Sequence, residues 1–94
     1  MYAWDEVKNE INIKKHGVSF EEAQDVFDDK NALYELDDEH SFNEERMVII
    51  GKSKKSRILF VCHCYRESDN IIRIISARKA DRFETDLYNC GGVL

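Results

Sequence analysis

Three apolar segments in the second half of the chain constrain the fold more than any other feature. They run over residues 46–51, 58–65 and 71–77, and short turns at 52–56 and 66–70 separate them. Segments of this length that are rich in Ile and Val favour β-strands, and such short connections make neighbouring strands antiparallel. Apolar residues occupy both faces of these strands. We therefore expect a sheet that is covered on both sides or packs against a partner.

The first half of the chain contains signals for two helices between two short strands, at residues 2–4 and 32–36. The first helix runs over residues 5–15, with Asp at its N-cap. Ser19 begins the second helix, and Glu22 three residues later completes the pattern of a capping box. The apolar positions of the first helix have loose helical spacing: Val7, Ile11 and Ile13.

A third helix is expected over residues 80–89, with Phe83, Leu87 and Tyr88 on its inner side. The order of elements is then β-α-α-β-β-β-β-α. This order predicts an α+β fold in which an antiparallel β-sheet packs with two N-terminal helices and one C-terminal helix.

The chain has 94 residues and a formal net charge of −5, which fits one domain over residues 1–94. No apolar run approaches the roughly 18 residues that span a membrane, and the start lacks a signal-peptide pattern. Three cysteines in such a chain indicate free thiols and a cytoplasmic location. Residues 1–47 hold 14 Asp and Glu against 5 Lys and Arg, whereas residues 48–94 hold 5 against 9. The basic second half keeps RNA possible as a partner.

Arg73 occupies an unusual position within the last apolar segment. Strict alternation places it on one strand face with Ile71, Ile75 and Ala77, whereas Ile72, Ile74, Ser76 and Arg78 share the other face. A charged group among isoleucines needs a partner or an open cleft. One interpretation is an ion pair with Glu45 or a carboxylate of the first helix. The other is an anion site, because the planar guanidinium fits phosphate oxygens.

Basic residues also gather where the last strand meets the third helix: Arg78, Lys79 and Arg82. Backbone N–H groups at a helix N-terminus attract anions, so these side chains are candidates for a phosphate cradle. They are equally common as ordinary surface residues of a helix.

Groups that move protons near neutral pH are present, but their spacing does not single any of them out. The candidates are His16, His63 and Tyr88. A histidine in an apolar strand is more often a hydrogen-bonded core residue, and His16 suits the negative end of a helix. Cys62 and Cys64 point away from His63 in a strand, so no metal site is expected. Three kinds of function stay open at this point: metal-free acid–base chemistry, binding, or a structural role.

The chain resembles the BrnT family of toxins from type II toxin–antitoxin modules. Four segments carry the resemblance: Trp4-Asp5 with the helix after it, the KHGVSFEEA block at 15–23, Glu45-Arg46 before the strand that ends at Gly51, and the RIISARKA block at 73–80 with Glu84 and Tyr88 beyond. The two longer blocks are the specific ones. Glu6 is a departure, because the family commonly has Pro there.

The resemblance implies a compact RelE-like ribonuclease that cuts RNA without metal or cofactor and halts translation. Its expected partner is a BrnA-like antitoxin, a ribbon-helix-helix protein that also binds operator DNA. This chain is then expected to contact operator DNA only through the antitoxin. Under this hypothesis Arg73 and Arg78 stabilise charge on the phosphate, and His63, His16 or Tyr88 move protons. The residues expected to hold RNA are Arg46, Lys79, Arg82, Lys52, Lys54 and Lys55.

Two other functions fit the same residues. The chain could be an inactive interaction module whose acidic residues 35–45 attract a basic antitoxin and which takes part in operon repression. It could also be an unattached cytosolic domain with redox-active thiols, which selective alkylation of one cysteine would reveal.

Overall fold

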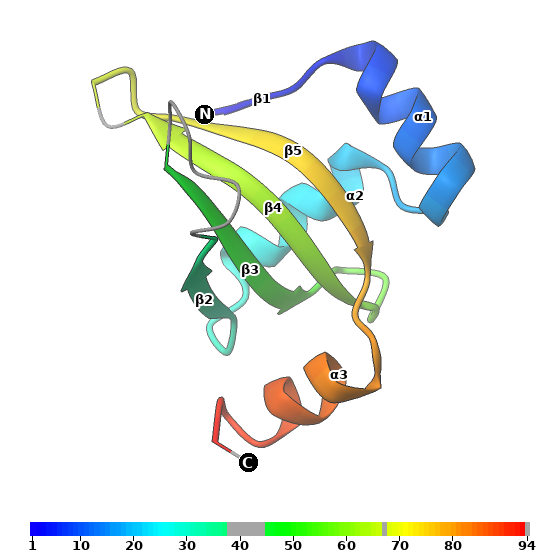
Figure 1. The fold of residues 1–94 in the computed structure, drawn as a ribbon, viewed down its shortest axis with the longest axis vertical. Helices are drawn as coiled ribbons and strands as arrows, with labels where there is room; N and C mark the ends of the chain where they lie inside the picture. The colour runs from blue at the N-terminus through cyan, green and yellow to red at the C-terminus, as the bar shows by residue number, and fades with distance from the viewer. Residues whose placement is uncertain (38–44, 67, 94) are drawn as a thin grey trace.

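The computed structural model describes residues 1–37, 45–66 and 68–93 (Figure 1). Its sheet has five strands in the order β1-β5-β4-β3-β2. The strands are β1 (Tyr2–Ala3), β2 (Leu33–Leu36), β3 (Arg46–Lys52), β4 (Ile58–Arg66) and β5 (Ile71–Lys79). The helices are α1 (Glu6–His16), α2 (Phe20–Gln24), the 3-10 helix η1 (Asp25–Asp28) and α3 (Arg82–Asn89).

The expected α+β fold and order of elements are confirmed, with two differences of detail. The turn η1 extends α2 by four residues. The edge strand β1 runs parallel to β5, while the other neighbouring strands are antiparallel. Residues 38–44, which belong to the acidic segment 35–45, lie outside the described residues. In the described part of the chain, no helix combines the length and hydrophobicity needed to cross a bilayer.

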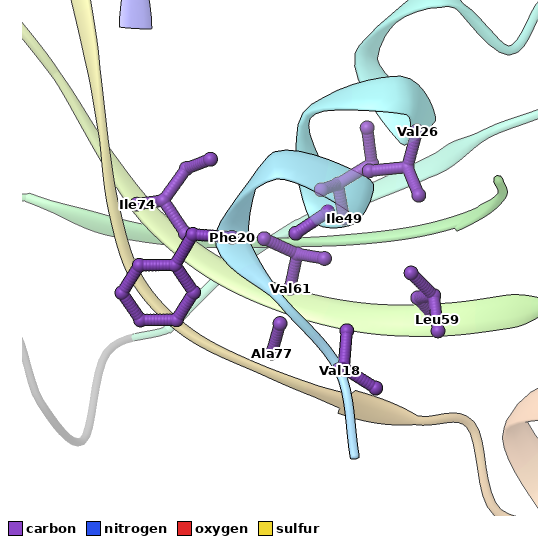
Figure 2. Close-up of a cluster of buried hydrophobic side chains, with 9 residues drawn as sticks. Val18, Phe20, Val26, Ile49, Leu59, Val61, Ile74 and Ala77 are labelled. Atoms are coloured by element: carbon purple, nitrogen blue, oxygen red, sulfur yellow. The ribbon is translucent and has the colours of Figure 1, made fainter. Parts of the chain in front are cut away.

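The two faces of the sheet have different surroundings. On one, here called the covered face, α1 and α2 lie against β5 and η1 lies against β3. Figure 2 shows the core formed there, where Phe20 and Val26 from the helical layer meet Ile49, Val61 and Ile74 from the strands. On the opposite face, here called the open face, α3 is the one helix among the described residues, and it lies at the end of the sheet remote from the N-terminus (Figure 1).

An irregularity in β5 corrects the strict alternation expected for this strand. His63 pairs with Ile74, but the preceding residue Cys62 pairs with Ser76, so Ile75 is an extra residue without a partner on β4. The bulge places Ile74 and Ala77 together in the core of the covered face.

The helix α1 presents polar residues to the protein and apolar residues to solvent, which the apolar spacing of its sequence did not indicate. Asn12 is buried, and its amide donates to the carbonyls of Val18 and Ala77, both at 2.8 Å. The Ala77 N–H in turn donates to Asn12 Oδ1 at 3.2 Å. Val7 and Ile11 remain exposed on the outer side. These buried hydrogen bonds fix which side of α1 faces the sheet.

Two further expectations about the helices need correction. Ser19 accepts the Glu22 N–H at 3.0 Å, but the Glu22 carboxylate turns to Arg57 instead of completing a capping box. The complete capping box belongs to α3, between Asp81 and Glu84. On the same helix Phe83 is exposed rather than inward.

Candidate functional site

Two arginines flank a buried thiol on the open face. In the strand register Arg46 of β3 and Arg73 of β5 both pair with Cys64 of β4. Residues directly opposite each other point to the same side of a sheet, and adjacent strands lie about 4.8 Å apart. The two arginine Cα atoms are therefore about 10 Å apart, with Cys64 between them. Arginine side chains are long enough to reach a common point above the sheet from such positions.

Arg73 lies beside a hollow at the β1 edge. The hollow has a volume of about 390 Å³ and is lined by Ala3, Trp4, Asp5, Asp69, Ile71 and Arg73. Arg73 is partly buried, and no described residue forms a hydrogen bond or ion pair with its side chain. The ion pair with Glu45 or a carboxylate of α1, one of the two interpretations of this residue, is therefore absent. The geometry favours an anion site at this guanidinium.

Arg78 shares the open face with Arg73 because the bulge at Ile75 reverses the alternation between them. Its guanidinium donates to Glu84 at 2.7 and 2.9 Å and lies 4.0 Å from the centroid of the Phe60 ring. The hydrogen bonds to Glu84 raise the pKa of Arg78 above its usual value, although burial opposes this. The charge of Arg78 is thus neutralised within the protein, and the side chain fixes α3 on the sheet.

Tyr88 also lies on the open-face side, packed against Val48 and Ile50. Its hydroxyl donates to Asp29 Oδ2 at 2.6 Å. Burial, together with the hydrogen bond and charge of Asp29, raises the pKa of Tyr88 to about 12. A phenol with such a pKa suits a hydrogen-bond donor better than a base at neutral pH.

The two candidate histidines do not lie on the face of the sheet that carries Arg46 and Arg73. His63 lies on the covered face, 3% exposed, with its ring perpendicular to Phe27 at 4.8 Å between centroids. Burial lowers the pKa of His63, although the Val61 backbone opposes the shift. His16 is the last residue of α1, which packs on the covered face. The sheet therefore separates His63 from Arg73.

The other basic candidates lie toward the opposite end of the sheet from Arg46 and Arg73. Lys52 ends β3, and Lys54 and Lys55 form the exposed turn before β4. Lys79 pairs with Leu59 and so lies on the covered face, whereas Arg82 is exposed at the start of α3. These side chains form a basic end of the molecule rather than one compact site.

The thiols have a structural environment. Cys62 and Cys64 are buried, and Cys90 is exposed. Burial is the largest influence on the Cys62 thiol and raises its pKa, which disfavours the reactive thiolate. Across residues 1–37, 45–66 and 68–93, no three His, Cys, Asp or Glu side chains come together as a metal site would require.

Two carboxylates position candidate residues, and neither role was predicted from the sequence. Glu84 holds Arg78, and Asp29 holds Tyr88. A local signal existed for Glu84, because it follows Asp81 by three residues at a helix start, as in a capping box. No local signal existed for Asp29, which is 59 residues from Tyr88 in the sequence.

Comparison with known proteins adds a family to this geometry. Residues 4–84 match a family model described as "Ribonuclease toxin, BrnT, of type II toxin-antitoxin system". The chain is also similar to the 1.1 Å crystal structure of the ribonuclease toxin BrnT from Brucella abortus, with a TM-score of 0.65 and 26% sequence identity. That match covers 87% of this chain and 99% of the other. No protein among the curated sequences matches this chain.

Proposed function

Because the chain belongs to the BrnT family of ribonuclease toxins of type II toxin–antitoxin systems, we propose that it is a metal-independent endoribonuclease whose RNA crosses the open face of the sheet. One observation carries this proposal. Arg73 presents a guanidinium beside an open hollow, and no described side chain forms a hydrogen bond or ion pair with it. Such a group binds a phosphate that arrives from solution.

The reaction proposed is transesterification within the RNA. The ribose 2′-hydroxyl oxygen attacks the neighbouring phosphorus, the bond to the 5′ oxygen breaks, and a cyclic phosphate forms. One proton leaves the attacking hydroxyl and one reaches the departing oxygen. Negative charge on the phosphate oxygens grows between these events, and Arg73 stabilises it. In this proposal Arg46, which pairs with Cys64 from the other side, holds the same or the next phosphate.

Arg78 and Tyr88 have a different role in this proposal. Each is held by a carboxylate, Glu84 or Asp29, and each attaches α3 to the sheet. They shape the end of the open face along which RNA lies. Among His16, His63 and Tyr88, only Tyr88 lies on the same side as Arg73. The proposed mechanism therefore depends on charge stabilisation by arginine and assigns no proton transfer to either histidine.

The basic residues at the far end of the sheet extend the proposed RNA path. Lys52, Lys54, Lys55 and Arg82 are exposed there, beyond Arg78. They contact flanking phosphates without reading sequence, which predicts salt-dependent binding. Lys79 points to the covered face and is left out of this path.

The proposed biological setting follows from the family. In the cytoplasm, cleavage of RNA inhibits translation, and a cognate antitoxin of the BrnA-like, ribbon-helix-helix type neutralises the chain. Contact with operator DNA occurs through that antitoxin alone. Support for this setting is the membership of a type II toxin family.

The test is cleavage of purified RNA by the refolded or antitoxin-free chain, with and without a chelator. Cleavage that persists in EDTA is expected, and its complete loss would contradict metal independence. Arg73→Ala is expected to lower the rate by roughly 100-fold, the effect of removing one preorganised donor to a developing oxyanion. The matched control is Lys14→Ala, which removes one exposed positive charge from α1 and is expected to cleave normally.

An alternative outcome would identify the chain as an inactive interaction module. In that case the wild-type chain binds its antitoxin and neither cleaves RNA nor arrests growth. Full toxicity of Arg73→Ala would instead show that the catalytic centre lies elsewhere on the molecule.

A further inference from the structure

A groove lies on the covered face where the helices end. It has a volume of about 200 Å³ and is lined by Phe27, Tyr34, Met47, His63, Tyr65 and Ile72. Most of its lining is apolar. Its position beside β2, at one edge of the sheet, makes the free edge of that strand part of the same surface. We refer to it as the β2 groove.

The backbone of β2 has hydrogen-bonding groups that point away from the sheet. Asp37 N–H donates to the Arg46 carbonyl at 2.8 Å, which fixes the phase of the antiparallel ladder between β2 and β3. Bonded and non-bonded pairs alternate along such a ladder. Glu35 therefore bonds to β3, while the N–H and C=O groups of Tyr34 and Leu36 point outward. An edge of this kind is a template for another strand.

The side chains at these two positions are apolar and exposed. Tyr34 is 56% exposed, Leu36 is 44% exposed, and Tyr65 across the groove is 49% exposed. Large apolar and aromatic side chains that gather at one place on a surface indicate a protein contact, and tyrosine is enriched at the centres of such contacts.

A buried polar residue lines the same groove. His63 lines the groove and is 3% exposed, and its Nδ1 atom has no hydrogen-bond partner among the described residues. Buried polar atoms are rarely left unpaired in proteins.

The charges along the edge of β2 select the kind of partner. Glu35 is exposed between Tyr34 and Leu36, and its pairing with Val48 places it on the opposite face of the strand from them. Asp28 is exposed nearby, and its negative charge acts on the Tyr2 hydroxyl beside the groove. A segment with basic residues complements this surface.

We propose that the edge of β2 accepts an extended segment of the antitoxin as an added strand. Alternate apolar side chains of that segment fill the β2 groove, and the Lys or Arg side chains between them meet Glu35. The identity of this partner rests on the proposed function. Because the β2 groove and Arg73 lie on opposite faces, the added strand holds the toxin without occupying the phosphate site.

Hydrogen exchange in the complex of this chain with the antitoxin from its own operon tests the proposal. The outward amides of Tyr34 and Leu36 are expected to exchange roughly tenfold or more slowly in the complex than in the free chain. The amide of Glu35 is already bonded to β3 and serves as the internal reference. Unchanged exchange at Tyr34 and Leu36 in a fully formed complex would overturn the proposal.

Substitutions provide an independent readout. Leu36→Pro removes an outward N–H and leaves the ladder to β3 intact, since proline is tolerated on edge strands at that position. It is expected to weaken antitoxin binding by roughly tenfold or more. Tyr34→Lys is the second variant, in case Leu36→Pro lowers the melting temperature. Phe83→Ala, which removes an exposed aromatic ring from α3, is the control and is expected to bind normally.

RNA cleavage separates this inference from the proposed function. Leu36→Pro and Tyr34→Lys are expected to cleave RNA as the wild-type chain does, because neither residue lies on the open face. If the two variants bind the antitoxin more weakly but even the wild-type chain does not cleave RNA, the proposed antitoxin site is supported and the proposed ribonuclease activity is rejected. Normal antitoxin binding by both variants would reject the proposed antitoxin site at β2, whatever the cleavage result.

Discussion

Arg78 and Glu84 form a two-point ion pair that joins the last strand of the sheet to the helix that follows it. Nη1 donates to Oε1 at 2.7 Å and Nη2 donates to Oε2 at 2.9 Å. Glu84 Oε1 also accepts the Asp81 N–H at 2.9 Å. One carboxylate therefore begins α3 and attaches it to the open face.

Glu84→Gln is expected to lower the free energy of unfolding by about 1 kcal/mol, since the pair is partly exposed and water screens part of its strength. Chemical denaturation measures this change. Glu10→Gln on the exposed side of α1 removes the same charge and is expected to leave stability nearly unchanged. Equal effects of the two substitutions would show that the ion pair contributes nothing specific.

Tyr88→Phe removes the hydroxyl that donates to Asp29 and is expected to destabilise the fold by about 1–2 kcal/mol. The raised pKa of Tyr88, about 12, adds a pH dependence. The contribution of this hydroxyl to stability is complete below its ordinary pKa of 10.0 and decreases as the pH rises from there toward 12. Denaturation of the wild-type and Tyr88→Phe chains between pH 8 and 12 is expected to show their stabilities converging.

The same substitution distinguishes an anchor from a catalyst. If Tyr88 only attaches α3, Tyr88→Phe cleaves RNA normally at temperatures well below its melting point. A loss of roughly 100-fold or more in a folded Tyr88→Phe chain would instead assign it a proton transfer.

Glu22 and Arg57 connect α2 to the turn between β3 and β4. The buried Glu22 carboxylate accepts from Arg57 Nε at 2.9 Å, from Arg57 Nη2 and from Ser53 Oγ at 2.8 Å. Glu22→Gln is expected to destabilise the protein by about 3 kcal/mol, because it leaves a partly buried guanidinium without its charge partner. Glu21→Gln, next in sequence and exposed, is the matched control.

Acid unfolding tests the same pair. The hydrogen bonds from Arg57 lower the pKa of Glu22 below its ordinary value of 4.5. The pair therefore stabilises the fold above that pH, and its contribution decreases as the pH falls further. The stability difference between the wild-type and Glu22→Gln chains is expected to narrow below pH 4.5. A constant difference across this range would contradict the assigned interaction.

Gly51 leaves room for the backbone of η1 to approach β3. A Cβ atom at this position would lie 2.9 Å from Val26 Cβ and 3.2 Å from the Val26 carbonyl oxygen. Gly51→Ala is expected to destabilise the protein by about 1–3 kcal/mol, the usual effect of overpacking. Thermal unfolding measures it. If Gly51→Ala instead increases stability, as it does at an ordinary strand glycine, η1 does not pack tightly against β3 at this position.

Much of the fold follows from local sequence patterns. The three apolar segments become β3, β4 and β5, and the caps at Asp5 and Ser19 begin α1 and α2. These features depend on residues within a few positions of each other, so the sequence displays them directly. The inner side of α1 did not follow, because Asn12 is oriented by hydrogen bonds to Ala77, which is 65 residues away.

The candidate site divides in the same way. The sequence by itself determined that arginines lie within the last strand and at its end, and that this segment resembles a ribonuclease family. Only the tertiary structure decided which of them share a face of the sheet and which of them has a carboxylate partner. A single extra residue, Ile75, moves Arg78 to the face of Arg73, and Glu84 then neutralises Arg78, while Arg73 forms no ion pair with a described residue. The pairing of β4 with β5 places that bulge, and strand alternation along one segment does not contain this information.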